Sequence, residues 1–124
     1  NGERRRRVLK YNIKENKLYY ITMTWLEVTI DGRRIRIDSQ YSFSIQMWRE
    51  YKHNDDRWNE SHIEEVRGRS YINIERRRWA VERLVYKAHN PEWDILNYSK
   101  HNQIKFVNGY RGDCSIDNLV IEAL

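Results

Sequence analysis

The sequence LYYITMTWLEVTIDGRRIRI, residues 18–37, predicts a β-hairpin. Apolar and polar residues alternate along its first part, as they do in a strand with one buried face. The apolar phase shifts at Trp25 and Leu26, which predicts a β-bulge near that point. Asp31-Gly32 predicts a tight turn, because both residues tolerate the positive φ of a type I′ hairpin turn.

The strand that returns from this turn predicts a basic sheet face. Ile35 and Ile37 point to one side of the strand, so Arg34 and Arg36 point to the other. A third short strand is expected at residues 41–46, where apolar and polar residues alternate again.

The following segments predict a second hairpin and then a helix. Residues 47–66 show no clean period, and we expect one short helix or turn with a loop there. The elements expected next are a strand at 69–75, a tight turn through Arg76-Arg77, a strand at 78–81 and a helix at 82–89. Leu84, Val85 and Ala88 would face inward, and Asn90-Pro91 would end the helix because a residue before proline disfavours helical geometry.

Length and composition predict one domain, residues 1–124, with one core. It comprises a charged N-terminal segment at 1–17, expected to be partly mobile, a β-rich part at 18–67 and a C-terminal part at 68–124. No apolar run reaches the roughly 18 residues of a membrane span, and no signal sequence is apparent. The single cysteine, Cys114, excludes an internal disulfide, so we expect a cytoplasmic protein.

The formal net charge of +5 favours a polyanionic partner. Arginines dominate the basic clusters, and the planar guanidinium group suits phosphate contacts. These clusters are Arg4–Arg7, Arg33–Arg34 with Arg36, and Arg76–Arg78. Three such clusters in a small domain predict a nucleic-acid-binding face. The five tryptophans are expected mainly in the core, with any exposed ones beside arginines forming an interface hot spot or a stacking platform.

Four stretches of the C-terminal part together resemble a known family. They are GRSYINI at 68–74, ERLVYKAHNP at 82–91, NQIKFVNG at 102–109 and IDNL at 116–119. In their order and spacing they resemble the HNH endonucleases of bacteriophages, including the homing type. The resemblance covers nearly half of the chain and implies a β-hairpin followed by a helix that together hold one divalent metal ion.

The residues that would cut DNA in that family are replaced here. An Asp-His pair before the hairpin turn normally supplies a metal ligand and the general base, and Lys105-Phe106 stand in its place. Glu82 replaces a frequent His, and Cys114 replaces an Asn before the second strand. Asn118, which the resemblance implies supports the hairpin loop, is kept. The metal-binding helix would follow the last residue of the sequence, so we expect neither a metal nor a cofactor.

The expected fold is α+β, with an N-terminal antiparallel β-hairpin or small sheet joined to a remnant ββα-type hairpin with one or two short helices. The leading hypothesis is a catalytically inactive, HNH-like phage protein that binds DNA through a basic surface. Its expected phosphate contacts are Arg34, Arg36, Arg76, Arg77, Arg78, Lys105 and Arg111. A second hypothesis is an inhibitor or modulator of a host protein, such as a defence nuclease or the transcription machinery. A third is an active metal-dependent endonuclease with a relocated site that uses Glu82, His101 or Asp113.

Overall fold

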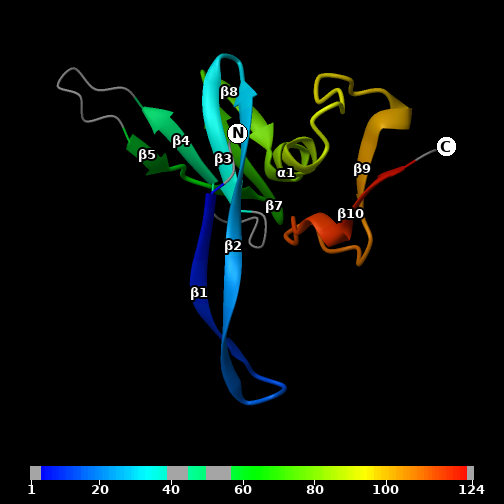
Figure 1. The fold of residues 1–124 in the computed structure, drawn as a ribbon. Helices are drawn as coiled ribbons and strands as arrows, with labels where there is room; N and C mark the ends of the chain where they lie inside the picture. The colour runs from blue at the N-terminus through cyan, green and yellow to red at the C-terminus, as the bar shows by residue number, and fades with distance from the viewer. Residues whose placement is uncertain (1–3, 39–44, 50–56, 123–124) are drawn as a thin grey trace.

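Antiparallel strands in three sheets surround one α-helix in the residues that the computed structural model describes, 4–38, 45–49 and 57–122 (Figure 1). The first sheet contains β1 (Arg4–Asn12), β2 (Lys17–Ile30), β3 (Arg33–Asp38), β4 (Ile45–Arg49) and β5 (Arg57–Glu60), in that order. The second contains β6 (Glu64–Val66), β7 (Arg69–Ile74) and β8 (Arg77–Ala80), and the third contains β9 (Gln103–Phe106) and β10 (Leu119–Glu122). Helix α1 (Val81–His89) follows β8, and the short 3₁₀ helices η1 (Lys100–Asn102) and η2 (Ile116–Asn118) precede β9 and β10.

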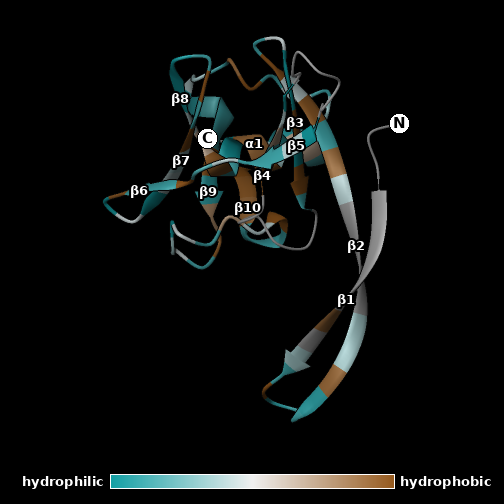
Figure 2. Ribbon diagram, turned by 90° about the vertical axis from the view of Figure 1, so that its left-hand side faces the viewer, coloured by the Kyte–Doolittle hydropathy of each residue, from teal (hydrophilic) through white to brown (hydrophobic). Residues whose placement is uncertain are grey.

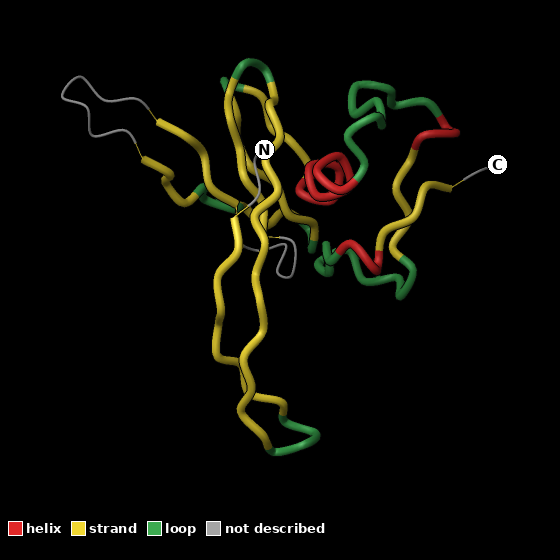
Figure 3. Tube along the Cα trace, in the orientation of Figure 1, coloured by secondary structure: helices red, strands yellow, loops and turns green. Residues whose placement is uncertain are grey.

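This mixture of strands and helix confirms the predicted α+β class. Figure 3 shows the strands of the first sheet on one side of α1 and the β9–β10 hairpin on the other. The hairpin predicted at residues 18–37 is present as β2 and β3. Asp31 and Gly32 form its two-residue turn with φ angles of 49° and 78°, the positive values that a type I′ turn requires.

The bulge predicted near Trp25 is wrong. β2 pairs without interruption with β1 up to Trp25 and with β3 from Trp25 onward. The apolar residues change from one face of β2 to the other because the two parts of the strand have different neighbours. From Lys17 to Thr24, β2 pairs with β1 alone among the described strands, whereas beyond that point Leu26 and Ile30 turn toward the core and Trp25 lies on the opposite face.

Two further predictions concern the N-terminal half. Residues 4–12, part of the segment expected to be partly mobile, form β1 and pair with β2 along their whole length. The described residues of this range, 47–49 and 57–66, contain no helix and supply the end of β4 together with β5 and β6, and Trp48 lies opposite Trp58 in the β4–β5 pair. Residues 39–44, which include most of the strand predicted at 41–46, lie outside the described residues.

The second hairpin and the helix follow the sequence prediction with small changes. The turn between β7 and β8 is Glu75-Arg76 rather than Arg76-Arg77, because Ile74 pairs with Arg77. Helix α1 ends at His89 with a cap at Asn90, whose backbone N–H donates to carbonyl groups of the last turn. The buried residues of α1 include the predicted inward set, Leu84, Val85 and Ala88.

One hydrophobic core joins all three sheets. Helix α1 packs against β2, β7, β8 and η2, and the hydrophobic segments gather around it in Figure 2. The core's fully buried side chains come from both halves of the chain and include Ile35, Ile37, Ile45, Ile72, Ile74, Trp79, Leu84 and Cys114. Burying this many large apolar groups supplies the main driving force for folding.

A two-stranded ribbon extends from the packed part of the molecule, which we call the body. It consists of β1, the loop at residues 13–16 and the outer part of β2, and we refer to residues 4–24 as the ribbon. Figures 1 and 2 both show it extending away from α1 and ending at the loop. The register runs from Arg5 opposite Thr24 at the base to Asn12 opposite Lys17 at the tip.

Candidate nucleic-acid interface

The outer face of the first sheet gathers arginines and tryptophans. Arg34 and Arg36 point away from the core, as the alternation predicts. Arg34 lies over the rings of Trp48 and Trp58, 4.9 Å and 5.3 Å from their centroids. Arg36 lies over Trp25 and Trp58 at 4.4 Å and 4.6 Å. The two guanidinium groups therefore cover the indole faces that a nucleic-acid base would need for stacking.

Acidic and amide side chains fix these two arginines in the sheet. Arg34 Nε donates to Glu27 Oε1 at 2.5 Å, and Arg36 Nε donates to Gln46 Oε1 at 2.7 Å. Gln46 Nε2 in turn donates to Glu60 Oε1 at 2.8 Å. Because carboxylates already offset the positive charge here, this face attracts phosphate less than its arginine content suggests.

The β7–β8 hairpin exposes the second predicted cluster. Arg76, Arg77 and Arg78 are all exposed. The Arg77 guanidinium lies 4.3 Å above the Trp79 ring, and that of Arg78 lies 4.3 Å above the Tyr71 ring. Stacking on an aromatic ring leaves the edge of a guanidinium group available for hydrogen bonds to phosphate.

The turn that carries Arg76 is conformationally strained. Glu75 and Arg76 have φ angles of 48° and 69°, in the left-handed region that L-residues with a Cβ disfavour. The two other two-residue turns between described strands have glycine at the second position, Gly32 and Gly68. The Glu75 carboxylate pairs with Arg33 at 2.8 Å and so ties this turn to the tip of the first hairpin. Strain of this kind concentrates at functional positions.

Lys105 and Arg111 lie apart from both clusters. Lys105 is exposed on β9, which Figure 1 shows beyond α1 from the first sheet. Arg111 Nη2 donates to the carbonyl oxygen of Arg67 at 2.8 Å, at the opposite end of β7 from Arg76. The structure therefore distributes the seven predicted contact residues over four places and does not bring them onto one face.

The β9–β10 hairpin and the segment between its strands contain Lys105, Phe106 and Asn118, three of the positions compared above with the HNH family. Phe106 packs against the core, while its neighbour Lys105 points to solvent. Asn118 Oδ1 accepts the backbone N–H of Asn108 at 2.9 Å, and its Nδ2 donates to the Asp113 carbonyl at 2.9 Å. Asn118 thus holds the loop between the two strands from within.

The same positions do not fit a divalent metal ion. Glu82 is 1% exposed and forms an ion pair with Arg69, whose Nη2 lies 2.5 Å from Glu82 Oε2. Burial, reinforced by the charge of Glu82, raises the pKa of the Cys114 thiol to about 12, so the thiol is protonated. Lys105 and Phe106 offer no ligand atom. Glu82, already paired with Arg69, is the one carboxylate among these positions, so they do not supply the Asp-His pair of the HNH family.

The three residues considered for a relocated site do not assemble into one. His101 is exposed on η1, and Glu82 is buried against Arg69. Asp113 uses both carboxylate oxygens within its loop, and its hydrogen bonds with Ser115 lower the pKa of the carboxyl group. No group of three or more His, Cys, Asp or Glu side chains in the described part of the chain is placed to hold a metal ion.

Arg83 has a structural role that the sequence did not reveal. It is 4% exposed, and its Nη atoms donate to the carbonyl oxygens of Ile95, Asn97 and Asn102 at 2.6 to 3.2 Å. Its guanidinium group also lies between the rings of Trp93 and Tyr98, at 4.6 Å and 4.2 Å. One helical arginine therefore organises the long connection between α1 and β9.

Sequence reasoning identified the basic cluster Arg4–Arg7 but did not include any residue of the ribbon among the expected phosphate contacts. Residues 4–24 contain seven basic residues and one acidic residue, Glu15, a formal net charge of +6. The other residues contain 16 basic and 17 acidic residues, a formal net charge of −1. Counting charge by segment would have found this signal. The chain's whole positive excess lies on the part that extends from the body.

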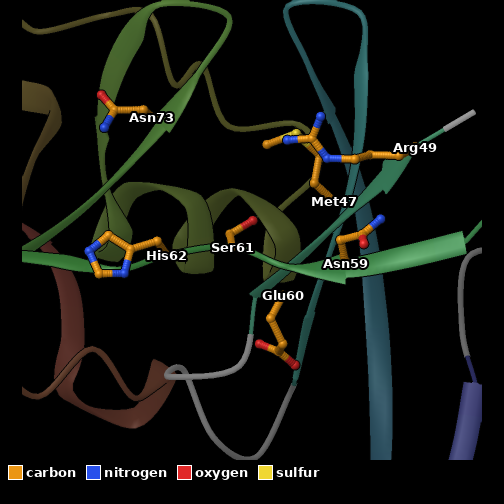
Figure 4. Close-up of a pocket in the computed structure, with 7 residues that line it drawn as sticks. All are labelled: Met47, Arg49, Asn59, Glu60, Ser61, His62 and Asn73. Carbon is orange, nitrogen blue, oxygen red and sulfur yellow. The ribbon is translucent and has the colours of Figure 1, made fainter.

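A shallow hollow of about 320 Å³ lies between the first and second sheets (Figure 4). It is lined by Met47, Arg49, Asn59, Glu60, Ser61, His62 and Asn73. Figure 4 shows Asn73 and His62 on one side and Arg49 and Asn59 on the other, without a common point toward which their polar atoms converge. This hollow shows no arrangement for catalysis.

Comparison of the chain with protein-family models, with curated proteins and with solved structures gives no match. The resemblance to HNH endonucleases therefore stays a prediction from the sequence. No helix among the described residues has both the length and the apolar character to cross a membrane.

Proposed function

We propose that this chain binds duplex DNA without cutting it and that the ribbon makes the principal contact. The observation that carries the proposal is the separation of charge, +6 on residues 4–24 and −1 on the rest. A concentrated positive charge on an extended element attracts a polyanion and releases its counterions on binding. β-Ribbons and β-sheets are also known to place their strands in the major or the minor groove of DNA.

Arginine content and position support the same proposal. β1 begins with the four consecutive arginines Arg4–Arg7, and arginine binds phosphate oxygens in a bidentate manner. Lys14 and Lys17 are exposed at the distal end of the ribbon. The sequence thus places basic residues from the first position of the ribbon to its distal end. Arg76, Arg77 and Arg78 would form a second, separate phosphate contact on the body.

The non-catalytic part of the proposal rests on the HNH-like hairpin. Its metal-ligand and base positions carry Lys105 and Phe106, and Glu82 is held in a buried ion pair with Arg69. Hydrolysis of a phosphodiester by this mechanism needs a cation to stabilise the developing charge and a base to activate water. The residues at these positions supply neither.

The test is fluorescence-anisotropy titration of a labelled random duplex over a salt series. Binding is expected to weaken steeply with salt, since each phosphate contact contributes about −0.9 to the slope of log K against log salt. The variant Lys14→Gln/Lys17→Gln should make the slope shallower by up to about 1.8. Arg67→Gln/Lys100→Gln removes the same charge from exposed sites outside the ribbon and should leave the slope close to that of the unmodified chain.

Two outcomes would contradict the proposal. If the protein does not bind the duplex even at low salt, the DNA-binding function is wrong, and a protein partner becomes the hypothesis to test. Nicking of supercoiled DNA in magnesium or manganese, lost in Glu82→Ala or Asp113→Ala, would show a catalytic site and overturn the non-catalytic part.

A further inference from the structure

One face of the ribbon is an exposed apolar strip. Leu9 pairs with Tyr20, and Tyr11 pairs with Leu18, so these four side chains share one face because paired residues of antiparallel strands point the same way. Each is at least half exposed. Such a patch on an element outside the core indicates a binding surface.

The loop at the tip presents a fifth apolar side chain. Ile13 is 83% exposed at the first loop position. Hydrogen bonds organise the loop around it. The Asn12 side chain accepts the backbone N–H of Glu15 at 3.1 Å, and the Tyr11 hydroxyl donates to the side chain of Asn16, whose φ is 50°. Asn tolerates this left-handed conformation, so the loop holds Ile13 at the extreme end of the ribbon.

The charge of the ribbon identifies the class of partner that covers the strip. A second copy would bring its own ribbon with a net charge of +6 against the first, which opposes pairing of the two. A hydrocarbon layer is disfavoured by the backbone. Among the described strands, β1 is the edge of its sheet and β2 pairs with β1 alone before Trp25. Both ribbon edges therefore carry backbone polar groups that a bilayer would leave unsatisfied. A polyanion in water avoids both problems.

Duplex DNA meets the basic and the apolar requirement in one place. Phosphates line the rims of the minor groove, and the deoxyribose rings form its apolar walls. Apolar side chains that enter this groove can wedge between base steps and kink the duplex. The ribbon combines a basic strand, an apolar strip and an exposed aliphatic residue at its end, which are the parts that this mode of binding uses.

We propose that the ribbon lies in the DNA minor groove and that Ile13 inserts at a base step and bends the duplex. This inference rests on the proposed DNA binding and adds the groove and the deformation. The strip of Leu9, Tyr11, Leu18 and Tyr20 contacts the sugars, and the basic residues contact the phosphates.

The experiment measures bending and groove choice on the full chain. A duplex labelled at both ends with a donor and an acceptor should show increased energy transfer when the protein binds. Netropsin, which occupies the minor groove of A·T sequences, should compete for binding. Ile13→Ser should abolish the increase and weaken binding by at least about tenfold, the scale set by full burial of an aliphatic side chain.

Two matched variants control for folding and for loss of apolar surface in general. Ile13→Leu keeps an aliphatic wedge and should retain the increased energy transfer. Leu96→Ser changes a residue that is 58% exposed on the α1–β9 connection and should bind and bend like the unmodified protein. All three substitutions lie at exposed sites, so the far-UV circular dichroism should be unchanged.

The outcomes separate this inference from the proposed function. Salt-sensitive binding without bending, or with equal bending by Ile13→Ser, would overturn the wedge and leave DNA binding in place. Competition by the major-groove ligand methyl green instead of netropsin would overturn the choice of groove. Failure to bind any duplex would overturn both proposals, and binding to vesicles of phosphatidylcholine and phosphatidylserine in preference to DNA would assign the apolar strip to a membrane surface instead.

Discussion

Replacing Arg76 with glycine is expected to stabilise the protein while weakening its binding to DNA. Arg76 has a φ of 69° at the second position of the β7–β8 turn. The left-handed conformation costs a residue with a Cβ about 1 to 2 kcal/mol, and glycine avoids this cost. Glycine also raises the entropy of the unfolded chain, which removes about 0.5 to 1 kcal/mol of the gain.

The net expectation is a gain of about 0.5 to 1 kcal/mol in the free energy of unfolding, or about 2 to 4 °C in Tm for a domain of this size. The Arg76 side chain is exposed and makes no hydrogen bond or ion pair with the described residues, so its removal should cost little elsewhere. The DNA-binding slope against salt should become shallower by about 0.9 if Arg76 contacts phosphate.

Two glycines in equivalent turns of the same protein serve as a reference for the gain in the free energy of unfolding expected of Arg76→Gly. Gly32 and Gly68 occupy the equivalent turn position with φ of 78° and 80°, and a Cβ added at either would meet nothing within 4 Å. Gly32→Ala and Gly68→Ala should therefore lose stability for conformational reasons alone. Urea unfolding of the three variants gives the comparison. A loss in both alanine variants with no gain in Arg76→Gly would refute the idea that the Glu75-Arg76 turn stores strain.

Three other predictions follow from buried groups. Arg83→Met should lower the free energy of unfolding by about 3 kcal/mol or more in urea titrations, because it leaves three carbonyl groups without their buried donor. Cys114 should resist Ellman's reagent in the folded protein near neutral pH and react after unfolding, because burial raises its pKa to about 12; rapid labelling of the native protein would contradict this. Burial lowers the pKa of His89 although Asp117 opposes the shift, so the folded state binds this proton less readily than the unfolded chain. The free energy of unfolding should therefore fall as the pH drops below the ordinary histidine pKa of 6.5, and His89→Gln should show a smaller loss between about pH 7.5 and pH 5.

Local signals in the sequence sufficed for the elements that local rules determine. The Asp31-Gly32 turn, the α1 helix and the inward side chains of Leu84 and Val85 follow from turn chemistry and helical periodicity. The turn at Glu75-Arg76 was misplaced by one residue, because neither residue belongs to the types that normally occupy a type I′ turn. Contacts elsewhere in the fold hold this turn although its residue types disfavour it, so the local sequence does not predict its position.

Most of β4, and all of β5 and β6, were missed for a different reason. Residues 47–66 contain aromatic and charged residues without a clean period, because the outer face of β4 and β5 is covered by Trp48, Trp58 and the arginines over their rings rather than by a regular apolar row. Such pairs stabilise a sheet through neighbours on other strands, which alternation along one strand does not report. The apolar phase shift at Trp25 failed as evidence for a bulge on the same ground, since it records a change of neighbours and not of register.

The candidate site was predicted from arginine clusters, and the structure shows why clusters are an incomplete guide. Arg83 holds backbone carbonyls, Arg69 holds Glu82, and Arg34 lies on tryptophan rings beside Glu27. Each of these arginines is engaged by groups that the fold brings next to it from another element or from the opposite strand of its hairpin. Whether an arginine is available to phosphate depends on the acidic residues that fold around it. The ribbon differs because its single acidic residue, Glu15, cannot offset seven basic ones, and the body to which it is joined is nearly neutral. The charge that remains after folding, rather than the number of arginines, is therefore the property on which we base the proposal that the ribbon binds a polyanion.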